Sequence, residues 1–99
     1  MKSNKVKRNE ITERYEMVLD NGRVAFINYY ITPDGNVALT HTDVPYGDEG
    51  QGVGSELVKQ TLEEIEGRNS KVIPSCSFVA AYIRRHPEWK RLVVEYKYV

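Results

Sequence analysis

A run of closely spaced glycines offers the clearest chemistry in this 99-residue sequence. Residues 48–55 read Asp-Glu-Gly-Gln-Gly-Val-Gly-Ser, between an expected strand and an expected helix. Glycines let a backbone approach an anion closely, and the N–H groups of a helix's first turn attract negative charge. The segment lacks the Lys-Ser/Thr pair of an NTP-binding P-loop, and its third glycine comes too early for a dinucleotide fingerprint. It predicts a pyrophosphate site; a connector made only for tight turning is the alternative.

The single cysteine is the second candidate. Cys76 stands between two serines, where an expected strand ends and an expected helix begins. A helix N-terminus stabilises a thiolate, and ligands gather at the carboxyl ends of strands in open α/β sheets. Cys76 is therefore a candidate reactive thiol. The competing interpretation is a small buried residue, the common environment of a free cysteine.

A histidine is the third candidate, because His41 lies on an expected strand a few residues before the glycines. An imidazole titrates near neutral pH, so it could act as a general base or help to ionise Cys76. A lone histidine near a strand end is more often a core or edge residue held by hydrogen bonds. Both interpretations stay open from the residues alone.

Strands fill the first half of the chain. Residues 14–19 alternate in polarity, residues 24–31 are apolar or aromatic on both faces, and residues 37–44 form a third strand. The turns between them are Asp20-Asn21-Gly22 and Pro33-Asp34-Gly35. In the third strand, alternation places Val37, Leu39 and His41 on one face. The opposite face would then carry Ala38, Thr40, Thr42 and Val44.

The second half changes to a helical period. Apolar residues recur every three or four positions from Val53 to Ile65, and Gly67 suits the left-handed residue that closes a helix. A strand at 71–74 follows, and this order implies a right-handed crossover with parallel pairing. A helix at 76–86, capped by Ser75, and a last strand at 92–98 complete the chain. The fold class is α/β, with a mixed sheet: an antiparallel meander, a β-α-β unit, and a short C-terminal helix and strand.

Composition narrows the class of protein. Fourteen basic and fourteen acidic residues cancel, which argues against nucleic-acid binding. No apolar run reaches the roughly 18 residues of a membrane span, and one cysteine cannot form an internal disulfide. We expect one domain over residues 1–99, in which the lysine-rich residues 1–10 form a flexible tail. We also expect a cytoplasmic location, a monomer or weak dimer, no metal, and no membrane or nucleic-acid partner.

Four segments, taken in order, resemble one known family. They are His41-Thr42-Asp43-Val44-Pro45, Gly50-Gln51-Gly52-Val53-Gly54, Ile73-Pro74-Ser75-Cys76-Ser77-Phe78 and His86-Pro87-Glu88-Trp89. From about residue 15 to residue 89, the sequence resembles the small GNAT-like N-acetyltransferases with a C-terminal cysteine motif. The resemblance implies a compact acyl-CoA N-acyltransferase fold, in which two central parallel strands separate to admit the pantetheine arm of acetyl-CoA.

The resemblance also implies roles for individual residues. Backbone of Thr42, Asp43 and Val44 would pair with pantetheine and could polarise the thioester carbonyl. Cys76 and His41 would lie near the acetyl group as catalytic residues. The remaining cofactor-binding residues would be Gly50, Gln51, Gly52, Val53, Gly54, Ser55 and Ser77.

Two departures from the family pattern affect this interpretation. Glu49 stands where the family usually has Gln or Arg, so its side chain should point to solvent, away from a pyrophosphate. The chain also lacks the N-terminal helices that usually wall the acceptor site. An open acceptor site suits a protein or peptide amine, and equally suits weak catalysis or none.

The function implied is transfer of an acetyl group from acetyl-CoA to a primary amine of a protein, peptide or small molecule. Either the amine attacks the thioester directly, with His41 or a water relay as base, or Cys76 carries the acetyl group transiently. The alternative is a non-catalytic acetyl-CoA-binding sensor or adaptor. A thiol-based oxidant sensor at Cys76 is a third hypothesis, which leaves the glycines unexplained.

Overall fold

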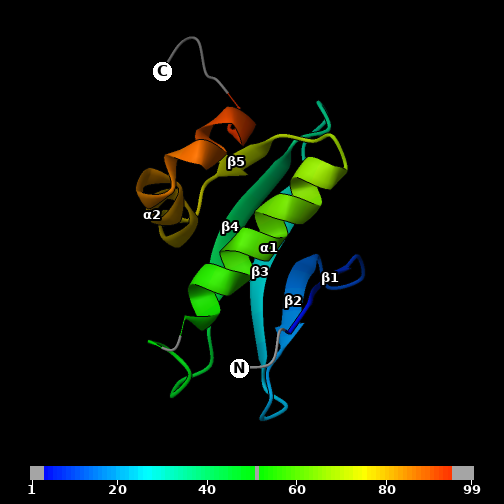
Figure 1. Cartoon of the computed structure of the whole chain (residues 1–99). Coiled ribbons are helices and arrows are strands. Elements are labelled where there is room, and N and C mark those ends of the chain that lie inside the picture. The colour runs from blue at the N-terminus through cyan, green and yellow to red at the C-terminus, as the bar shows by residue number, and fades with distance from the viewer. Residues whose placement is uncertain (1–3, 51, 95–99) are drawn as a thin grey trace.

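Five strands, two α-helices and one 3-10 helix make up the described part of the chain. The computed structural model describes residues 4–50 and 52–94 (Figure 1). The strand order follows the chain, β1-β2-β3-β4-β5; β1 to β4 pair antiparallel, and β5 joins β4 in parallel after the crossover through α1. The mixed sheet and its parallel crossover agree with the prediction. The elements are β1 (Val6–Asn9), β2 (Arg14–Val18), β3 (Val24–Ile31), β4 (Val37–Asp43), α1 (Val53–Gly67), β5 (Val72–Pro74), α2 (Ser77–Arg85) and η1 (Pro87–Leu92).

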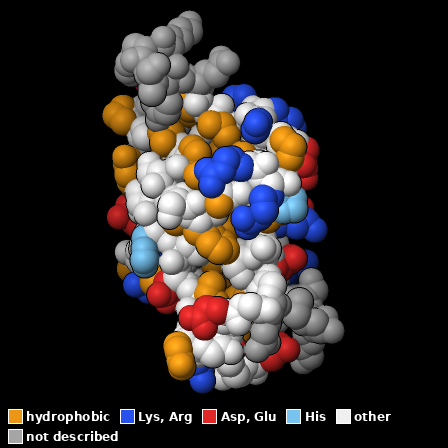
Figure 2. Space-filling view, turned by 90° about the vertical axis from the view of Figure 1, so that its left-hand side faces the viewer, with side chains coloured by type: hydrophobic (Ala, Val, Ile, Leu, Met, Phe, Trp, Pro, Cys, Tyr) orange, Lys and Arg blue, Asp and Glu red, His pale blue; other side chains and the backbone are white. Residues whose placement is uncertain are grey.

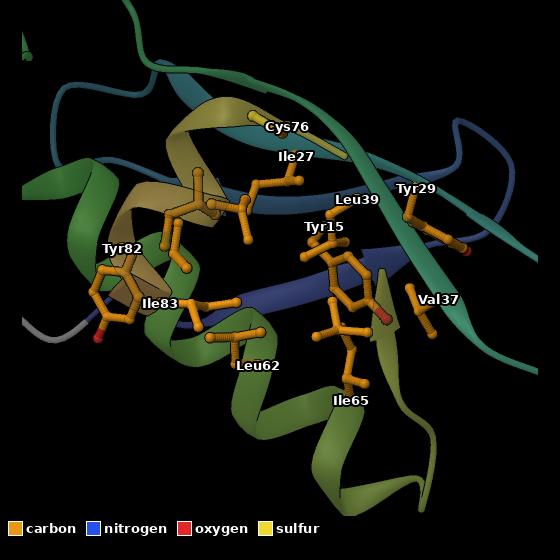
Figure 3. Packing of buried hydrophobic residues seen from close by; sticks show 14 of the residues in the cluster. Tyr15, Ile27, Tyr29, Val37, Leu39, Leu62, Ile65, Cys76, Tyr82 and Ile83 are labelled. Atoms are coloured by element: carbon orange, nitrogen blue, oxygen red, sulfur yellow. The ribbon is translucent and has the colours of Figure 1, made fainter. Parts of the chain in front are cut away.

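One hydrophobic core joins the sheet to both α-helices (Figure 3). Ile27 and Leu39 from the sheet are fully buried, as is Leu62 from α1, and Ile83 brings α2 into the same cluster. The predicted apolar stripe of α1 is confirmed, because Leu57, Val58, Leu62 and Ile65 are its buried apolar residues. Burial of this stripe fixes α1 across the sheet, so its N-terminus lies near the end of β4.

An extra residue in β4 changes which side chains share a face. Tyr29 pairs with Leu39 and Asn28 pairs with His41, which leaves Thr40 unmatched as a bulge. Because side chains alternate along a strand, the extra residue reverses the faces beyond it. Thr42 pairs with the buried Ile27 and therefore shares the core face, whereas His41 lies on the opposite face. The prediction that His41 shares a face with Val37 and Leu39 is wrong.

The prediction of a flexible tail over residues 1–10 is wrong for residues 6–9, which form β1. Val6–Asn9 pairs antiparallel with β2, where Val6 lies opposite Met17. The Gln60 side chain of α1 accepts the Val6 N–H at 2.8 Å and donates to the Asn4 carbonyl at 2.7 Å. The amide thus supplies the hydrogen bonds that a further strand would make at the edge of β1. Residues 1–3 lie outside the described part of the chain.

The helix ends also depart from the predictions. Gly67 lies within α1, and Asn69 adopts the left-handed conformation instead, with φ of 60°. Cys76, not Ser75, is the N-cap residue of α2.

In place of the expected last strand, Leu92 ends η1 and Val93 makes only an isolated parallel bridge with Val72. The rest of that prediction, residues 95–98, lies outside the described residues. Within residues 4–50 and 52–94, no helix is both long enough and apolar enough to cross a membrane.

Candidate functional site

β4 and β5 separate where the candidate site begins. They pair only from Val37 with Val72 to Leu39 with Pro74. Beyond that point β4 continues to Asp43, while the other chain turns away and the Cys76 N–H donates to the Leu39 carbonyl at 2.9 Å. We call the region between residues 40–43 and the N-terminus of α2 the β4–α2 junction. The separation of two parallel strands agrees with the prediction from the resemblance, but β5 lies at the edge of the described sheet and not at its centre.

Cys76 lies at the β4–α2 junction as a buried free thiol, 8 % exposed. Its Sγ is 3.3 Å from the Thr42 Oγ1. Burial raises the pKa of the Cys76 thiol, but the Thr42 hydroxyl and the N–H groups of Val79, Phe78 and Thr42 lower it, and the net pKa is below the ordinary value. A thiol whose surroundings favour the thiolate is a better nucleophile at neutral pH.

The structure does not bring His41 to Cys76. The exposed imidazole lies on the opposite face of the sheet, with its ring centroid 6.4 Å from that of Phe26. Arg14 and His41 both pair in register with Asn28, and the Arg14 guanidinium stacks 3.8 Å from the Phe26 centroid. His41 therefore belongs to a polar row on the open face of the sheet. Direct proton transfer between the two predicted catalytic residues has no geometric support.

The glycine segment has the backbone that an anion site requires. Gly50 and Gly52 have φ of 82° and 79°, a region that favours glycine, and a Cβ on either would meet no atom within 4 Å. Gly52 is the N-cap of α1 and has no side chain with which to cap it. The N–H groups of Val53, Gly54 and Ser55 precede the first helical bond, from Glu56 N–H to Gly52 O, so they remain for a ligand. These residues fit a pyrophosphate; Gln51 lies outside the described residues.

Gly54 has a different role. A Cβ there would lie 2.6 Å from Cζ of Phe78, so the missing side chain lets the first turns of α1 and α2 meet. Phe78 belongs to the quoted cysteine motif, but its contact with Gly54 was not predicted. The contact places the expected pyrophosphate segment beside the helix that begins at Cys76. Ser55 and Ser77 are exposed at these two helix starts.

The acidic residues of the loop are already engaged. Glu49 is exposed, as expected, and its Oε1 accepts the Gly47 N–H at 2.8 Å. Asp48 accepts from the Asn21 amide at 3.1 Å and lies 3.8 Å from Arg23. These contacts reduce the repulsion that two carboxylates would exert on a bound phosphate. Within the described ranges, no group of three His, Cys, Asp or Glu side chains could hold a metal ion.

The model of the GCN5-related N-acetyltransferase family matches residues 14–92, which run from β2 to the end of η1. The chain belongs to the GCN5-related N-acetyltransferase family. It is also similar to the NMR solution structure of a GCN5-like protein from Staphylococcus aureus, whose N-acetyltransferase activity is an inference. That match has a TM-score of 0.70 at 25 % identity, and it covers 99 % of this chain and 95 % of the other.

Membership of the GCN5-related family confirms the resemblance and the mixed α/β fold expected from it. All the residues expected to bind acetyl-CoA or to take part in catalysis lie within the matched segment. The family indicates an acyltransferase, and the site described above has to be interpreted in that context.

Proposed function

We propose that this chain transfers an acetyl group from acetyl-CoA to a primary amine, and that Cys76 carries the acetyl group transiently. The observation that carries the proposal is the meeting of three features at the β4–α2 junction. The thiol of Cys76 has a lowered pKa, β4 diverges from β5, and the Gly54–Phe78 contact brings the α1 N-terminus beside α2.

Backbone groups bind the cosubstrate in this proposal. The N–H groups at the start of α1 hold the pyrophosphate, and Gly50 and Gly52 leave the space for it. Backbone of Thr42, Asp43 and Val44 at the end of β4 pairs with the pantetheine arm. Acetyl-CoA supplies an activated thioester; the residues of the chain hold that thioester beside Cys76 and exclude water.

The reaction has two halves: acetylation of Cys76, and transfer of the acetyl group from Cys76 to the amine. The Cys76 thiolate attacks the acetyl carbon, the bond from that carbon to the coenzyme sulfur breaks, and the released thiolate takes up a proton from solvent. A neutral amine then attacks the acetyl carbon on Cys76, the carbon–Sγ bond breaks, and the amine nitrogen loses one proton as the amide forms. The Thr42 hydroxyl and the N–H groups around Sγ stabilise Cys76 as the leaving thiolate.

His41 takes part in the proposed reaction only through water molecules. Because its imidazole lies on the open face, it accepts the amine proton through a relay rather than by contact with Cys76. On this basis His41→Gln should reduce turnover only modestly, whereas Cys76→Ser should abolish it. Equal losses in the two variants would contradict this assignment.

Calorimetric titration with acetyl-CoA tests the binding half. Wild type should bind, and Gly52→Glu should lose binding because it adds a carboxylate to the open space at the α1 N-terminus. Gly35→Glu is the matched control, since Gly35 has φ of 84° and similar open space in a distant turn. Binding by all three proteins would show that the loop does not hold the pyrophosphate, and no binding by wild type would overturn the proposal.

Intact-mass analysis tests the chemical half. After incubation with acetyl-CoA, wild type should gain the mass of one acetyl group and lose it again when an acceptor amine is added. Cys76→Ser should bind acetyl-CoA but gain no thiol-linked acetyl group. Unchanged turnover by Cys76→Ser would rule out the covalent route. Binding with neither adduct nor product would favour the sensor or adaptor instead, a function consistent with the placement of His41 on the face of the sheet opposite Thr42 and Cys76.

A further inference from the structure

A cavity lies along α2, away from the glycine loop. Its volume is about 360 Å³, which falls within the roughly 300–1,000 Å³ of small-molecule sites. It is mainly apolar, with two cationic side chains and no acidic one among the described residues that line it. These are Pro74, Ala80, Ile83, Arg84, Lys90, Val93 and Val94. We call this cavity the α2 groove.

The α2 groove begins within one helical turn of the candidate nucleophile. The Ala80 N–H donates to the Cys76 carbonyl at 3.0 Å. Ala80 and Arg84 are four residues apart and follow one stripe of α2, which begins just after its N-cap residue Cys76. From Ser77 to Arg84 the helix rises by about 10 Å. The groove therefore runs from Pro74 and Ala80, which lie two residues before and four residues after Cys76, to its cationic end at Arg84 and Lys90.

The two cations have no acidic partner within residues 4–50 and 52–94. Neither Arg84 nor Lys90 takes part in any of the ion pairs formed there, and both are exposed. The face of the molecule that carries α2 shows Lys and Arg side chains beside hydrophobic ones (Figure 2). Arg favours a carboxylate because its N–H groups match the two oxygens, and nearby apolar surface strengthens the attraction.

We propose that the α2 groove binds the acceptor: an elongated amine with an apolar body and a carboxylate at its far end. The carboxylate lies at Arg84 and Lys90, the apolar body covers Ala80 and Ile83, and the amine reaches the β4–α2 junction. Polyamines are poor acceptors on this basis, because a second ammonium group would meet Arg84 and Lys90. The acceptor assignment rests on the proposed acetyl transfer, but occupancy of the groove can be measured without it.

The test is an NMR titration of the full-length protein with aminooctanoate, an apolar chain that carries an amine at one end and a carboxylate at the other. Saturable shifts are expected at Ala80, Ile83 and Val93. Aminooctanamide, which lacks the negative charge, should bind about tenfold more weakly, a difference of about 1.4 kcal/mol, because it loses a charge-assisted hydrogen bond. Arg84→Gln should weaken aminooctanoate to a similar extent and leave aminooctanamide unchanged.

Two variants make the result specific. Arg85→Gln removes the same charge from an exposed neighbour that does not line the groove, so it should bind aminooctanoate as wild type does. Ala80→Trp fills the groove and should abolish binding of both compounds. Equal weakening by Arg84→Gln and Arg85→Gln would reduce the effect to general electrostatics and overturn the proposal.

Other occupants of the groove would be recognised directly. A dimer of wild type that Arg84→Gln converts to a monomer would show that a second copy covers the groove, and would overturn the proposal. Binding of aminooctanoate by a chain that ends at Val94, with none by the full-length protein, would also overturn the proposal. A parallel titration with acetyl-CoA separates the two proposals: acetyl-CoA binding without aminooctanoate binding refutes only the acceptor site. Aminooctanoate binding without acetyl-CoA binding keeps the groove as a carboxylate site but refutes acetyl transfer.

Discussion

At the scale of single residues, the surroundings of Cys76 have two opposite effects on the pKa of its thiol. Burial disfavours a thiolate, yet the Thr42 hydroxyl and nearby backbone N–H groups favour it. The balance lowers the pKa of the Cys76 thiol, so Thr42 is a positioning residue whose side chain matters, whereas the sequence suggested a role only for its backbone. The bulge at Thr40 is what turns Thr42 toward the core.

Replacing Thr42 should therefore make Cys76 less acidic. Thr42→Val keeps the shape but removes the hydroxyl, so the midpoint of the pH dependence of iodoacetamide alkylation should rise toward that of a free thiol, about 8.5. Cys76 is the only cysteine, so the readout is unambiguous. Thr40→Val is the control, because the Thr40 hydroxyl bonds to the Asn28 carbonyl and not to Cys76. Identical midpoints in wild type and Thr42→Val would refute this role.

The same pKa shift makes stability depend on pH. Because the pKa of Cys76 is lower in the folded chain, the unfolded chain binds more protons between the two pKa values. The stabilisation is complete above the unfolded-state pKa and is lost as the pH falls through the folded-state pKa. The free energy of unfolding should thus rise with pH across this window, and rise less in Thr42→Val. Urea titrations at a series of pH values measure the difference.

At the scale of elements, two contacts between segments far apart in sequence complete the fold. Gln60 of α1 bonds to the backbone of Asn4 and Val6, and Phe78 of α2 packs on Gly54 of α1. The first contact holds an edge strand that has few apolar residues of its own. The second sets how closely the starts of the two helices approach.

Loss of the Gln60 amide should release β1. Gln60→Ala removes two hydrogen bonds to backbone and should lower the free energy of unfolding by about 1–2 kcal/mol. Hydrogen exchange of the Val6 amide should accelerate more than exchange of core amides. Lys59→Ala alters an exposed neighbour on α1 and should leave Val6 protected. Equal protection of Val6 in Gln60→Ala would mean that strand pairing alone holds β1.

A side chain at position 54 should couple to Phe78. Gly54→Ala places its Cβ against the Phe78 ring, so the ring has to move, at a cost of about 1 kcal/mol. Phe78→Ala removes the obstacle, and Gly54→Ala should then be tolerated. A double-mutant cycle from urea unfolding measures this coupling. Additive effects of the two substitutions would show that the contact does not limit the approach of the helices.

At the scale of the whole molecule, the meander and the β-α-β unit share one core and should unfold together. Trp89, the only tryptophan, is buried in the C-terminal half, whereas Ile27 lies in β3. Ile27→Ala should cost about 2–5 kcal/mol, because it removes a fully buried side chain. The Trp89 fluorescence transition in urea should shift with it and should coincide with the circular dichroism transition. Separate transitions would indicate that the two halves unfold independently.

Local patterns predicted the parts of the fold that depend on local chemistry. Alternation in residues 14–19 and the stripe in α1 identified a strand and a helix because each buries one face. The bulge at Thr40 escaped prediction, since an inserted threonine in an alternating strand leaves no mark in the sequence. β1 escaped because its charged residues resemble a solvated tail, and its edge partner Gln60 lies 54 residues away.

The candidate site was predictable as a set of segments but not as an arrangement. The glycines and Cys76 were identified from residue type and position, and the structure places the two segments side by side through Gly54 and Phe78. The sequence suggested that His41 could act together with Cys76. Alternation along a strand assigns faces by residue number, and it cannot reveal that the bulge at Thr40 reverses the faces beyond it. The α2 groove has no signature in the sequence, because its lining comes from β5, α2 and η1 together with the residues after η1.

The meeting of two helix N-termini also bears on folding itself. Each N-terminus carries roughly half a positive charge, and the Gly54–Phe78 contact holds two of them close together. These like partial charges repel, so the folded chain contains a local electrostatic penalty that an anion between the helices would relieve. An anion that binds only the folded chain shifts the folding equilibrium by mass action. The melting temperature of this protein should therefore vary with the phosphate compounds around it.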